Sequence, residues 1–133
     1  MTVKHQLKIK NEKDIIVVRK LGREVATDLG FNHIDQARIT TAISELARNV
    51  VKYAGKGTIS IEIIHKYVPG LQVVVRDDGP GIVNIKKAME DGYTTSNSLG
   101  AGLPGVKRLM DEFLIDSQVD NGTQIRVVKW LKN

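Results

Sequence analysis

The feature that most limits how this chain can fold is the order of its hydrophobic patterns. Over residues 11–30 and 32–55, apolar residues recur three and four positions apart, which is typical of amphipathic helices. Residues 58–65 and 71–75 then alternate apolar and polar side chains, as strands with one buried face do. Two helices followed by two strands exclude a regular strand–helix alternation and favour a sheet whose helices are grouped together.

Capping signals mark the ends of both expected helices. Each helix begins at an asparagine, Asn11 or Asn32, and an aspartate follows three residues later. Each ends at a glycine, Gly30 or Gly55, the residue that most easily adopts the left-handed backbone at a helix C-terminus. We therefore expect two separate helices joined by a short linker.

Further elements are expected on both sides of this region. Residues 2–10 loosely alternate and predict another strand. Residues 77–105 are rich in Gly, Asn, Ser and Thr, and a segment of this length without a stable element is usually functional or mobile. Pro104 suits the first turn of a helix, and two more strands are expected at residues 113–119 and 123–131.

Short turns between consecutive strands, such as the one expected at Pro69-Gly70, join strands as antiparallel neighbours. We therefore expect an α/β fold, a two-layer sandwich whose mixed, mainly antiparallel sheet carries helices on one face. The 133 residues fit a single domain, residues 1–133, because one core usually holds about 100–200 residues.

The composition excludes several kinds of chemistry. Without cysteine there is no disulfide, no thiolate nucleophile and no cysteine-based zinc site. The net charge of +5 comes from scattered basic residues, and aromatic residues make up only 5% of the chain, too few for a base-stacking surface. The sequence contains neither a signal peptide nor the roughly 20 apolar residues of a membrane span. We expect a cytoplasmic protein that binds neither nucleic acid nor membranes.

Glu45 and Asn49 form the first candidate site. A step of four residues turns a helix by about 400°, so the two side chains lie on one face, one turn apart. A carboxylate and an amide placed in this way can hold Mg²⁺, which prefers oxygen ligands, and can position a hydroxyl for attack on a phosphate. The alternative interpretation is a solvated helix face on which Glu45 pairs with Arg48.

Two glycine-rich segments form the other candidates. Asp77, Gly79 and Gly81 follow an apolar strand, where the carboxylate can accept a hydrogen bond from an exocyclic amine and the glycines let a flat ring such as adenine approach. Residues 100–105 precede a helix, whose N-terminal N–H groups attract phosphate. The first segment also fits a tight turn, and a lone GxGxxG is a weak signal.

The order of these motifs resembles the GHKL superfamily, which unites Hsp90, DNA gyrase B, histidine kinases and bacterial anti-sigma kinases. The shared features are Glu-x-x-x-Asn on a helix, Asp-x-Gly-x-Gly after a strand, Gly-x-Gly before a helix, and Gly122-Thr123 at the start of a late strand. The resemblance extends from about residue 37 to residue 123 and implies the GHKL, or Bergerat, two-layer sandwich. It also implies that ATP lies between the helix layer and a flexible lid over about residues 82–99.

The resemblance implies a role for each matching residue. Glu45 is similar to the family's general base, and Asn49 to its Mg²⁺ ligand in the ATP site. Asp77 matches the aspartate that accepts a hydrogen bond from the adenine amine. The remaining matches are Gly79 and Gly81 beside the adenine, Gly100, Ala101, Gly102 and Leu103 on the phosphates, and Thr123 in support of the adenine pocket.

Within the superfamily, residues 35–49 and 100–113 are similar to the stand-alone serine/threonine kinases of partner-switching modules. This similarity implies Mg²⁺- and ATP-dependent phosphorylation of STAS-domain scaffold and antagonist proteins of the stressosome. It also implies that the freed kinase binds and activates a PP2C-type phosphatase in general stress signalling. Two alternatives remain open, an anti-sigma factor kinase and a binding module in which ATP occupancy only sets the lid.

One position departs from the pattern of some anti-sigma kinases. They carry an arginine just before the second glycine motif, where it can stabilise charge on the transferring phosphoryl group. Here those positions hold Ser98 and Leu99, so the cation must come from elsewhere. The candidates are Lys52, Lys107 and Arg108.

Overall fold

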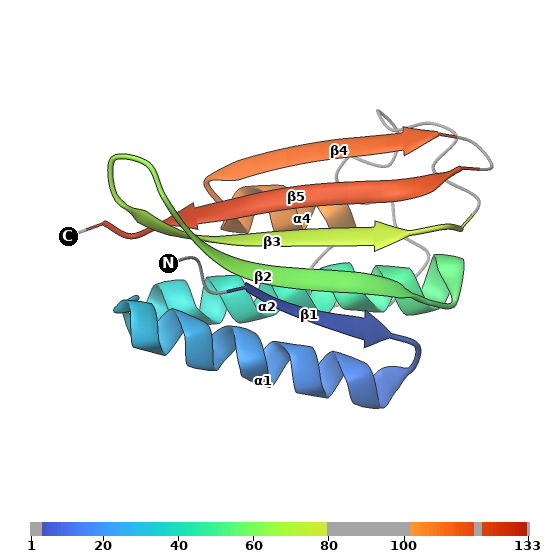
Figure 1. Ribbon diagram of the computed structural model, residues 1–133, viewed down its shortest axis with the longest axis horizontal. Helices are drawn as coiled ribbons and strands as arrows, with labels where there is room; N and C mark the ends of the chain where they lie inside the picture. The colour runs from blue at the N-terminus through green and yellow to red at the C-terminus, as the bar shows by residue number, and fades with distance from the viewer. Residues whose placement is uncertain (1–3, 80–101, 119–120, 133) are drawn as a thin grey trace.

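A computed structural model describes residues 4–79, 102–118 and 121–132 (Figure 1). Within these ranges five strands and three α-helices follow one another, and a π-helical turn, η1, continues the second helix. The elements are β1 (Lys4–Ile9), α1 (Glu12–Leu29), α2 (His33–Asn49), η1 (Val50–Ala54), β2 (Gly57–His65), β3 (Pro69–Asp77), α4 (Gly102–Leu109), β4 (Glu112–Gln118) and β5 (Gly122–Trp130). The expected order of elements is confirmed over the described residues.

The five strands form one sheet in the order β1-β2-β3-β5-β4. Each neighbouring pair is antiparallel. The sequence predicts a mixed, mainly antiparallel sheet, and the described sheet is antiparallel throughout. β5 is antiparallel to both β3 and β4, so these two strands run in the same direction without touching. Because β5 lies between β3 and β4, these two parallel strands are not neighbours and the described sheet contains no parallel pair.

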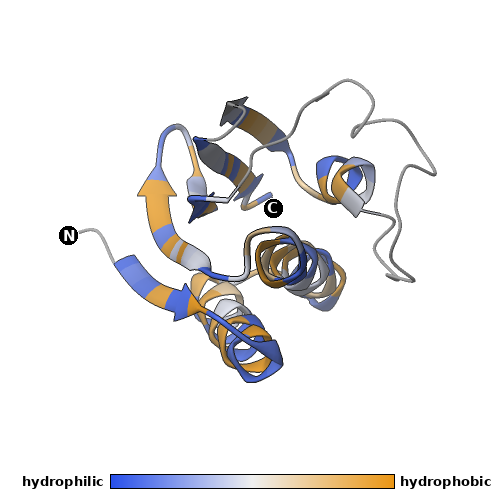
Figure 2. Ribbon diagram, turned by 90° about the vertical axis from the view of Figure 1, so that its right-hand side faces the viewer, coloured by the Kyte–Doolittle hydropathy of each residue, from blue (hydrophilic) through white to orange (hydrophobic). Residues whose placement is uncertain are grey.

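The helices cover one face of the sheet, and the predicted two-layer sandwich is confirmed (Figures 1 and 2). Alternate strand residues, such as Ile59, Ile61 and Val73, are fully buried against the helix layer. From the helices, Val18 of α1 and Ile43 of α2 enter the same core, as the helical periodicity predicted.

The opposite face of the sheet is polar, and its side chains bond to one another across the strands. The Arg126 side chain donates from Nε to Gln72 Oε1 at 2.6 Å and lies 3.5 Å from Glu112 Oε1. Glu112 Oε2 in turn accepts a hydrogen bond from the Trp130 indole at 2.7 Å. This face therefore needs no second layer of helices to cover it.

The predicted caps at Asn11, Asn32 and Gly30 are confirmed, whereas Gly55 follows η1 with φ +84° and ψ −38°, outside the left-handed helical region. Asn11 Oδ1 accepts a hydrogen bond from the backbone N–H of Asp14 at 3.2 Å, and Asn32 Oδ1 accepts one from that of Asp35 at 2.8 Å. Gly30 has φ +105°, the left-handed backbone that glycine adopts without a steric cost. The capping signals therefore placed both helix starts correctly.

The turn between β2 and β3 differs from the prediction. β3 already begins at Pro69, and the reversal lies at residues 66–68. Proline is tolerated as the first residue of a strand. Gly70 is needed for packing rather than for turning, because a Cβ built there would lie 2.6 Å from Cε3 of Trp130. The Pro-Gly pair thus marked the hairpin but not the position of its turn.

None of the helices in the described ranges is long and apolar enough to cross a membrane.

Candidate nucleotide and phosphoryl-transfer site

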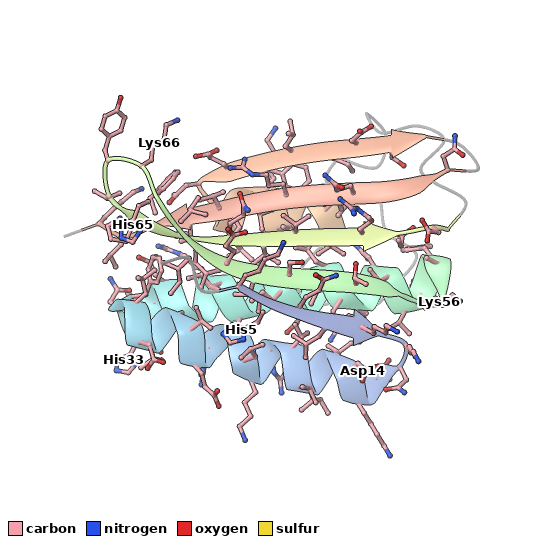
Figure 3. The ribbon with its side chains drawn as sticks, in the orientation of Figure 1. His5, Asp14, His33, Lys56, His65 and Lys66 are labelled. Carbon is pink, nitrogen blue, oxygen red and sulfur yellow. The ribbon has the colours of Figure 1, made fainter. Side chains whose placement is uncertain are left out.

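Three strand ends meet on one side of the molecule, where β2 and β5 begin and β3 ends (Figure 1). Asp77, the last residue of β3, pairs with Gly57 of β2 and with Thr123 of β5. Lys56, which precedes β2, is labelled at this end in Figure 3, whereas His65 and Lys66 mark the hairpin at the other end. The register thus brings two of the predicted site residues, Asp77 and Thr123, side by side.

The turn after Asp77 packs closely against the end of the second helix. A Cβ built on Gly79 would lie 2.6 Å from the Cβ of Ala54, the last residue of η1. A Cβ built on Gly57 would lie 2.5 Å from the carbonyl oxygen of Arg76 on β3 and 2.9 Å from Cγ1 of Val50, at the start of η1. Both glycines are therefore required for close approach, and they bring the helix that carries Glu45 and Asn49 against the Asp77 turn.

Asp77 adopts the tight turn that its sequence context allowed. Its Oδ1 accepts a hydrogen bond from the backbone N–H of Gly79 at 2.9 Å, and the residue is only partly buried. A carboxylate offers about four lone-pair sites, so this bond uses only part of its capacity. The Asp77 carboxylate can therefore accept the hydrogen bond that closes the turn and still accept one from an adenine amine.

Thr123 lies on the same side of the sheet as Asp77, because directly paired residues project from one face. Its Oγ1 is 2.7 Å from the Oγ of Ser117 on β4, and Ser117 also donates to the carbonyl of Gly122 at 3.3 Å. Sequence reasoning missed Ser117. The expected strand ends at residues 119 and 123 would have placed residue 119 opposite Thr123, whereas the β4–β5 register pairs Thr123 with Ser117.

Gly122 is a further residue that the site requires. Its φ is +86°, and a Cβ built on it would lie 2.1 Å from the carbonyl oxygen of Asp77. No other residue type fits this contact, because the conformation is left-handed and the obstacle is backbone. The glycine in the Gly122-Thr123 pair therefore maintains the pairing between the start of β5 and the end of β3.

Glu45 is buried rather than solvated, so this part of the alternative interpretation is wrong. Its side chain is only 3% exposed, while that of its partner Arg48 is 39% exposed. The expected pairing is present, with Arg48 Nη1 2.9 Å from Glu45 Oε1. Asn49, the last residue of α2, is partly buried. Burying a carboxylate costs free energy unless the group is paired or hydrogen-bonded. A buried Glu45 one turn from Asn49 is therefore not typical of a solvent-exposed helix face.

The segment that was predicted to bind phosphate, residues 100–105, is described only from Gly102 onward. Gly102 begins α4 with φ +71°, Leu103 is 7% exposed, and Pro104 falls in the first turn as predicted. α4 packs against α2, which brings its start to the same helix layer as Glu45. The predicted Gly81, Gly100, Ala101 and lid (residues 82–99) lie outside the described residues.

The described residues contain no group of three or more His, Asp or Glu side chains that could enclose a metal ion. Mg²⁺ in nucleotide sites commonly keeps several waters and uses one or two protein oxygens together with phosphate oxygens. The partly buried amide of Asn49 fits such a role as a single protein ligand.

The fold and the arrangement of the site agree with a known family. The model for the Histidine kinase-, DNA gyrase B-, and HSP90-like ATPase family matches residues 34–133. The chain therefore belongs to this family of ATPases.

Its relatives narrow the class further. Serine/threonine-protein kinase RsbT of Bacillus subtilis (strain 168) is 58% identical over 127 residues, which are 95% of this chain and 96% of RsbT. The Anti-sigma F factor of Thermoanaerobacter sp. (strain X514) is 31% identical over 100 residues, 71% of this chain and 70% of that protein. Within the family, the chain falls among the serine/threonine-protein kinases that RsbT represents.

Solved structures show the same fold. The RsbU and RsbW domains of Rv1364c from Mycobacterium tuberculosis match with a TM-score of 0.63 at 20% identity, over 95% of this chain and 32% of that one. The catalytic domain of histidine kinase ThkA matches with a TM-score of 0.57 at 18% identity, over 95% of both chains.

Proposed function

We propose that this kinase uses ATP and Mg²⁺ to phosphorylate serine or threonine on STAS-domain proteins, and that residues 1–133 form one catalytic domain. The observation that carries the proposal is the packing of the Asp77 turn against the end of the helix that bears Glu45 and Asn49. One side of this junction offers an acceptor for adenine. The other offers a buried carboxylate and an amide for the phosphates and the metal.

Nucleotide binding is assigned to the sheet end. Asp77 accepts a hydrogen bond from the adenine amine, and Gly79 and Gly81 leave room for the ring. Thr123, bonded to Ser117, supports the same pocket. The segment from Gly100 through Leu103 presents backbone N–H groups to the phosphates, as glycines before a helix do.

Phosphoryl transfer is assigned to the end of α2. The acceptor oxygen forms a bond to the γ-phosphorus while the bond from that phosphorus to the bridging oxygen of ADP breaks. Glu45 takes up the proton of the acceptor hydroxyl, and the carboxylate later releases it to water. Mg²⁺ bound at Asn49 supplies positive charge to the phosphate oxygens. Because Glu45 is buried, its carboxylate is held in one position rather than spread over many rotamers.

The partners are proposed from the similarity to RsbT. We assign STAS-domain stressosome scaffold and antagonist proteins as substrates and a PP2C-type phosphatase as the target of the freed kinase, all in the cytoplasm. The likeness to a structure that contains RsbU and RsbW domains supports a partner-switching context.

One alternative rests on a specific observation. The 31% identity to an Anti-sigma F factor also fits a protein that captures a sigma factor and phosphorylates its antagonist. Retention of a sigma factor in a pull-down with the purified chain separates this alternative from the phosphatase-activating kinase.

The proposal is tested by incubating the purified chain with γ-labelled ATP and candidate STAS-domain proteins, with Mg²⁺ or with a chelator. We expect label on the STAS-domain protein, and only when Mg²⁺ is present. If the labelled phosphate reaches no STAS-domain protein while a sigma factor is retained, the anti-sigma alternative replaces this one. If the phosphatase is activated equally by Asn49→Ala, activation is a binding event separate from catalysis.

A further inference from the structure

The source of the cation for phosphoryl transfer can be sought around Glu45. The sequence offers Lys52, Lys107 and Arg108 as candidates, because Ser98 and Leu99 occupy the positions where some related kinases carry arginine. In the structure, the ammonium of Lys52 lies 5.3 Å from the ring centre of the neighbouring Tyr53. Lys107 and Arg108 are exposed on α4. A fourth basic residue, Arg48, lies directly against Glu45.

The contact between Arg48 and Glu45 joins a half-exposed group to a buried one. The Arg48 side chain is 39% exposed, and its Nη1 reaches the buried Oε1 of Glu45 at 2.9 Å. Long side chains on a helix point back toward its N-terminus, so Arg48 extends over the turn that carries Glu45. A substrate hydroxyl that is hydrogen-bonded to the Glu45 carboxylate is therefore also close to the Arg48 guanidinium.

The guanidinium retains donors after binding Glu45. It carries five N–H groups in a planar fork, and among the described residues its contact with Oε1 is made by Nη1. The same fork fits the oxygens of a phosphoryl group, which a lysine ammonium meets only as a point charge. Arg48 therefore has the charge and the geometry to contact a phosphoryl group next to Glu45.

We propose that Arg48 is the cation of the transfer site, holding the Glu45 carboxylate and donating hydrogen bonds to the transferring phosphoryl group. The inference rests on the proposed function, in which Glu45 receives the proton of the acceptor. During transfer the acceptor O–P bond forms, the P–O bond to ADP breaks and Glu45 takes the proton. Arg48 exchanges no proton and offsets the negative charge on the equatorial phosphoryl oxygens.

The test compares Arg48→Met with a matched control on the same helix. Arg38 makes an equivalent pair three residues apart, with Nη1 3.0 Å from Asp35 Oδ1, but near the start of α2. We expect Arg48→Met to lower single-turnover transfer from ATP to a STAS-domain protein about a hundredfold or more, the loss typical of one transition-state donor. ATP affinity measured by calorimetry should change little, and Arg38→Met should transfer at the wild-type rate.

A double variant separates a direct role from an ion pair that only orients Glu45. Glu45→Gln removes the base, and Glu45→Gln with Arg48→Met removes both charges, so no buried charge is left without its partner. If Arg48 contacts the phosphoryl group, the double variant transfers at least about tenfold more slowly than Glu45→Gln alone. Equal residual rates in these two variants would overturn the inference for Arg48 while leaving Glu45 assigned. Full activity of Glu45→Gln would instead overturn the proposed function.

Discussion

At the scale of single residues, the site depends on positions where a side chain cannot be added. Gly57, Gly79 and Gly122 lie where β2, β3 and β5 meet, and a Cβ on any of them would lie within 3.0 Å of a neighbouring atom. At Gly79 the obstacle is a side chain, whereas at Gly122 it is backbone. The two kinds of obstacle lead to different expectations for mutation, because a side chain can be trimmed by a second substitution.

Gly79→Ala should weaken ATP binding, because the new methyl group pushes the Asp77 turn away from the end of η1. The built Cβ lies 2.6 Å from the Cβ of Ala54, so Ala54→Gly removes the main obstacle. We expect calorimetry to show at least tenfold weaker binding for Gly79→Ala and partial recovery for Gly79→Ala with Ala54→Gly. Recovery that fails completely would mean that Gly79 is needed for some reason other than this contact.

Asp77→Asn should abolish measurable ATP binding, because an amide places an NH₂ group where the adenine amine needs an acceptor. The neighbouring Asp78 is exposed, and Asp78→Asn therefore provides a control with the same change of charge. Nucleotide affinity is the measurement. Equal affinity in Asp77→Asn and the wild-type chain would contradict the adenine assignment.

At the scale of elements, one buried lysine ties β5 to two helices. The Lys129 side chain is 9% exposed, and its Nζ donates to the carbonyl of Leu109 at the end of α4 at 2.9 Å. The same ammonium lies 3.5 Å from Asp111 and 3.9 Å from Asp35 in the first turn of α2. This cluster lies at the end of α2 opposite to Glu45 and Asn49, so its role is to hold the helix layer on the sheet.

Lys129→Met should lower the free energy of unfolding by about 2–3 kcal/mol, because two aspartates and a carbonyl lose a buried partner. Lys132→Met is the control. Lys132 pairs with the same Asp111 at 3.3 Å, but its side chain is 70% exposed, and exposed pairs contribute less than about 1 kcal/mol. Chemical denaturation of both variants gives the comparison, and equal losses would contradict a special role for the buried ammonium.

The same cluster predicts how stability depends on pH. Burial raises the pKa of Asp111, but the hydrogen bond from Trp130 N–H and the charges of Lys129 and Lys132 outweigh it, so the pKa lies below its ordinary value of 3.8. A carboxyl with a lowered folded-state pKa stabilises the protein above its unfolded pKa and loses that contribution as pH falls through the folded value. We expect stability to decrease below about pH 4, and less steeply in Asp111→Asn.

At the scale of the whole molecule, local patterns predicted most of the fold. Caps at Asn11 and Asn32 and the alternation in β2 depend on neighbours in sequence, so they could be read directly. The antiparallel position of β5 between β3 and β4 depends on a crossover, which local alternation does not specify. For the same reason the burial of Glu45 could not be predicted, because it arises from tertiary packing around α2.

The residues of the candidate site likewise fall into those that the sequence could predict and those that depend on tertiary structure. The resemblance to the GHKL superfamily predicted Asp77 and Thr123 as site residues, and the register places them opposite one another. The sequence predicted Arg48 only as a partner for Glu45 on a solvated face. Spacing along a helix shows which side chains are neighbours, but it does not show how deeply they are buried. Ser117 carries no motif, and its contact with Thr123 follows from strand register alone.

The most direct test of the account is the rate of phosphoryl transfer by Glu45→Ala. With γ-labelled ATP, Mg²⁺ and a STAS-domain protein that accepts phosphate from the wild-type chain, we expect transfer to fall about a hundredfold or more. ATP affinity should stay within about threefold of wild type, because we assign nucleotide binding to Asp77 and the glycine segments rather than to Glu45. Transfer at the wild-type rate by a variant that lacks this carboxylate would contradict the assignment of Glu45 and the mechanism built on it.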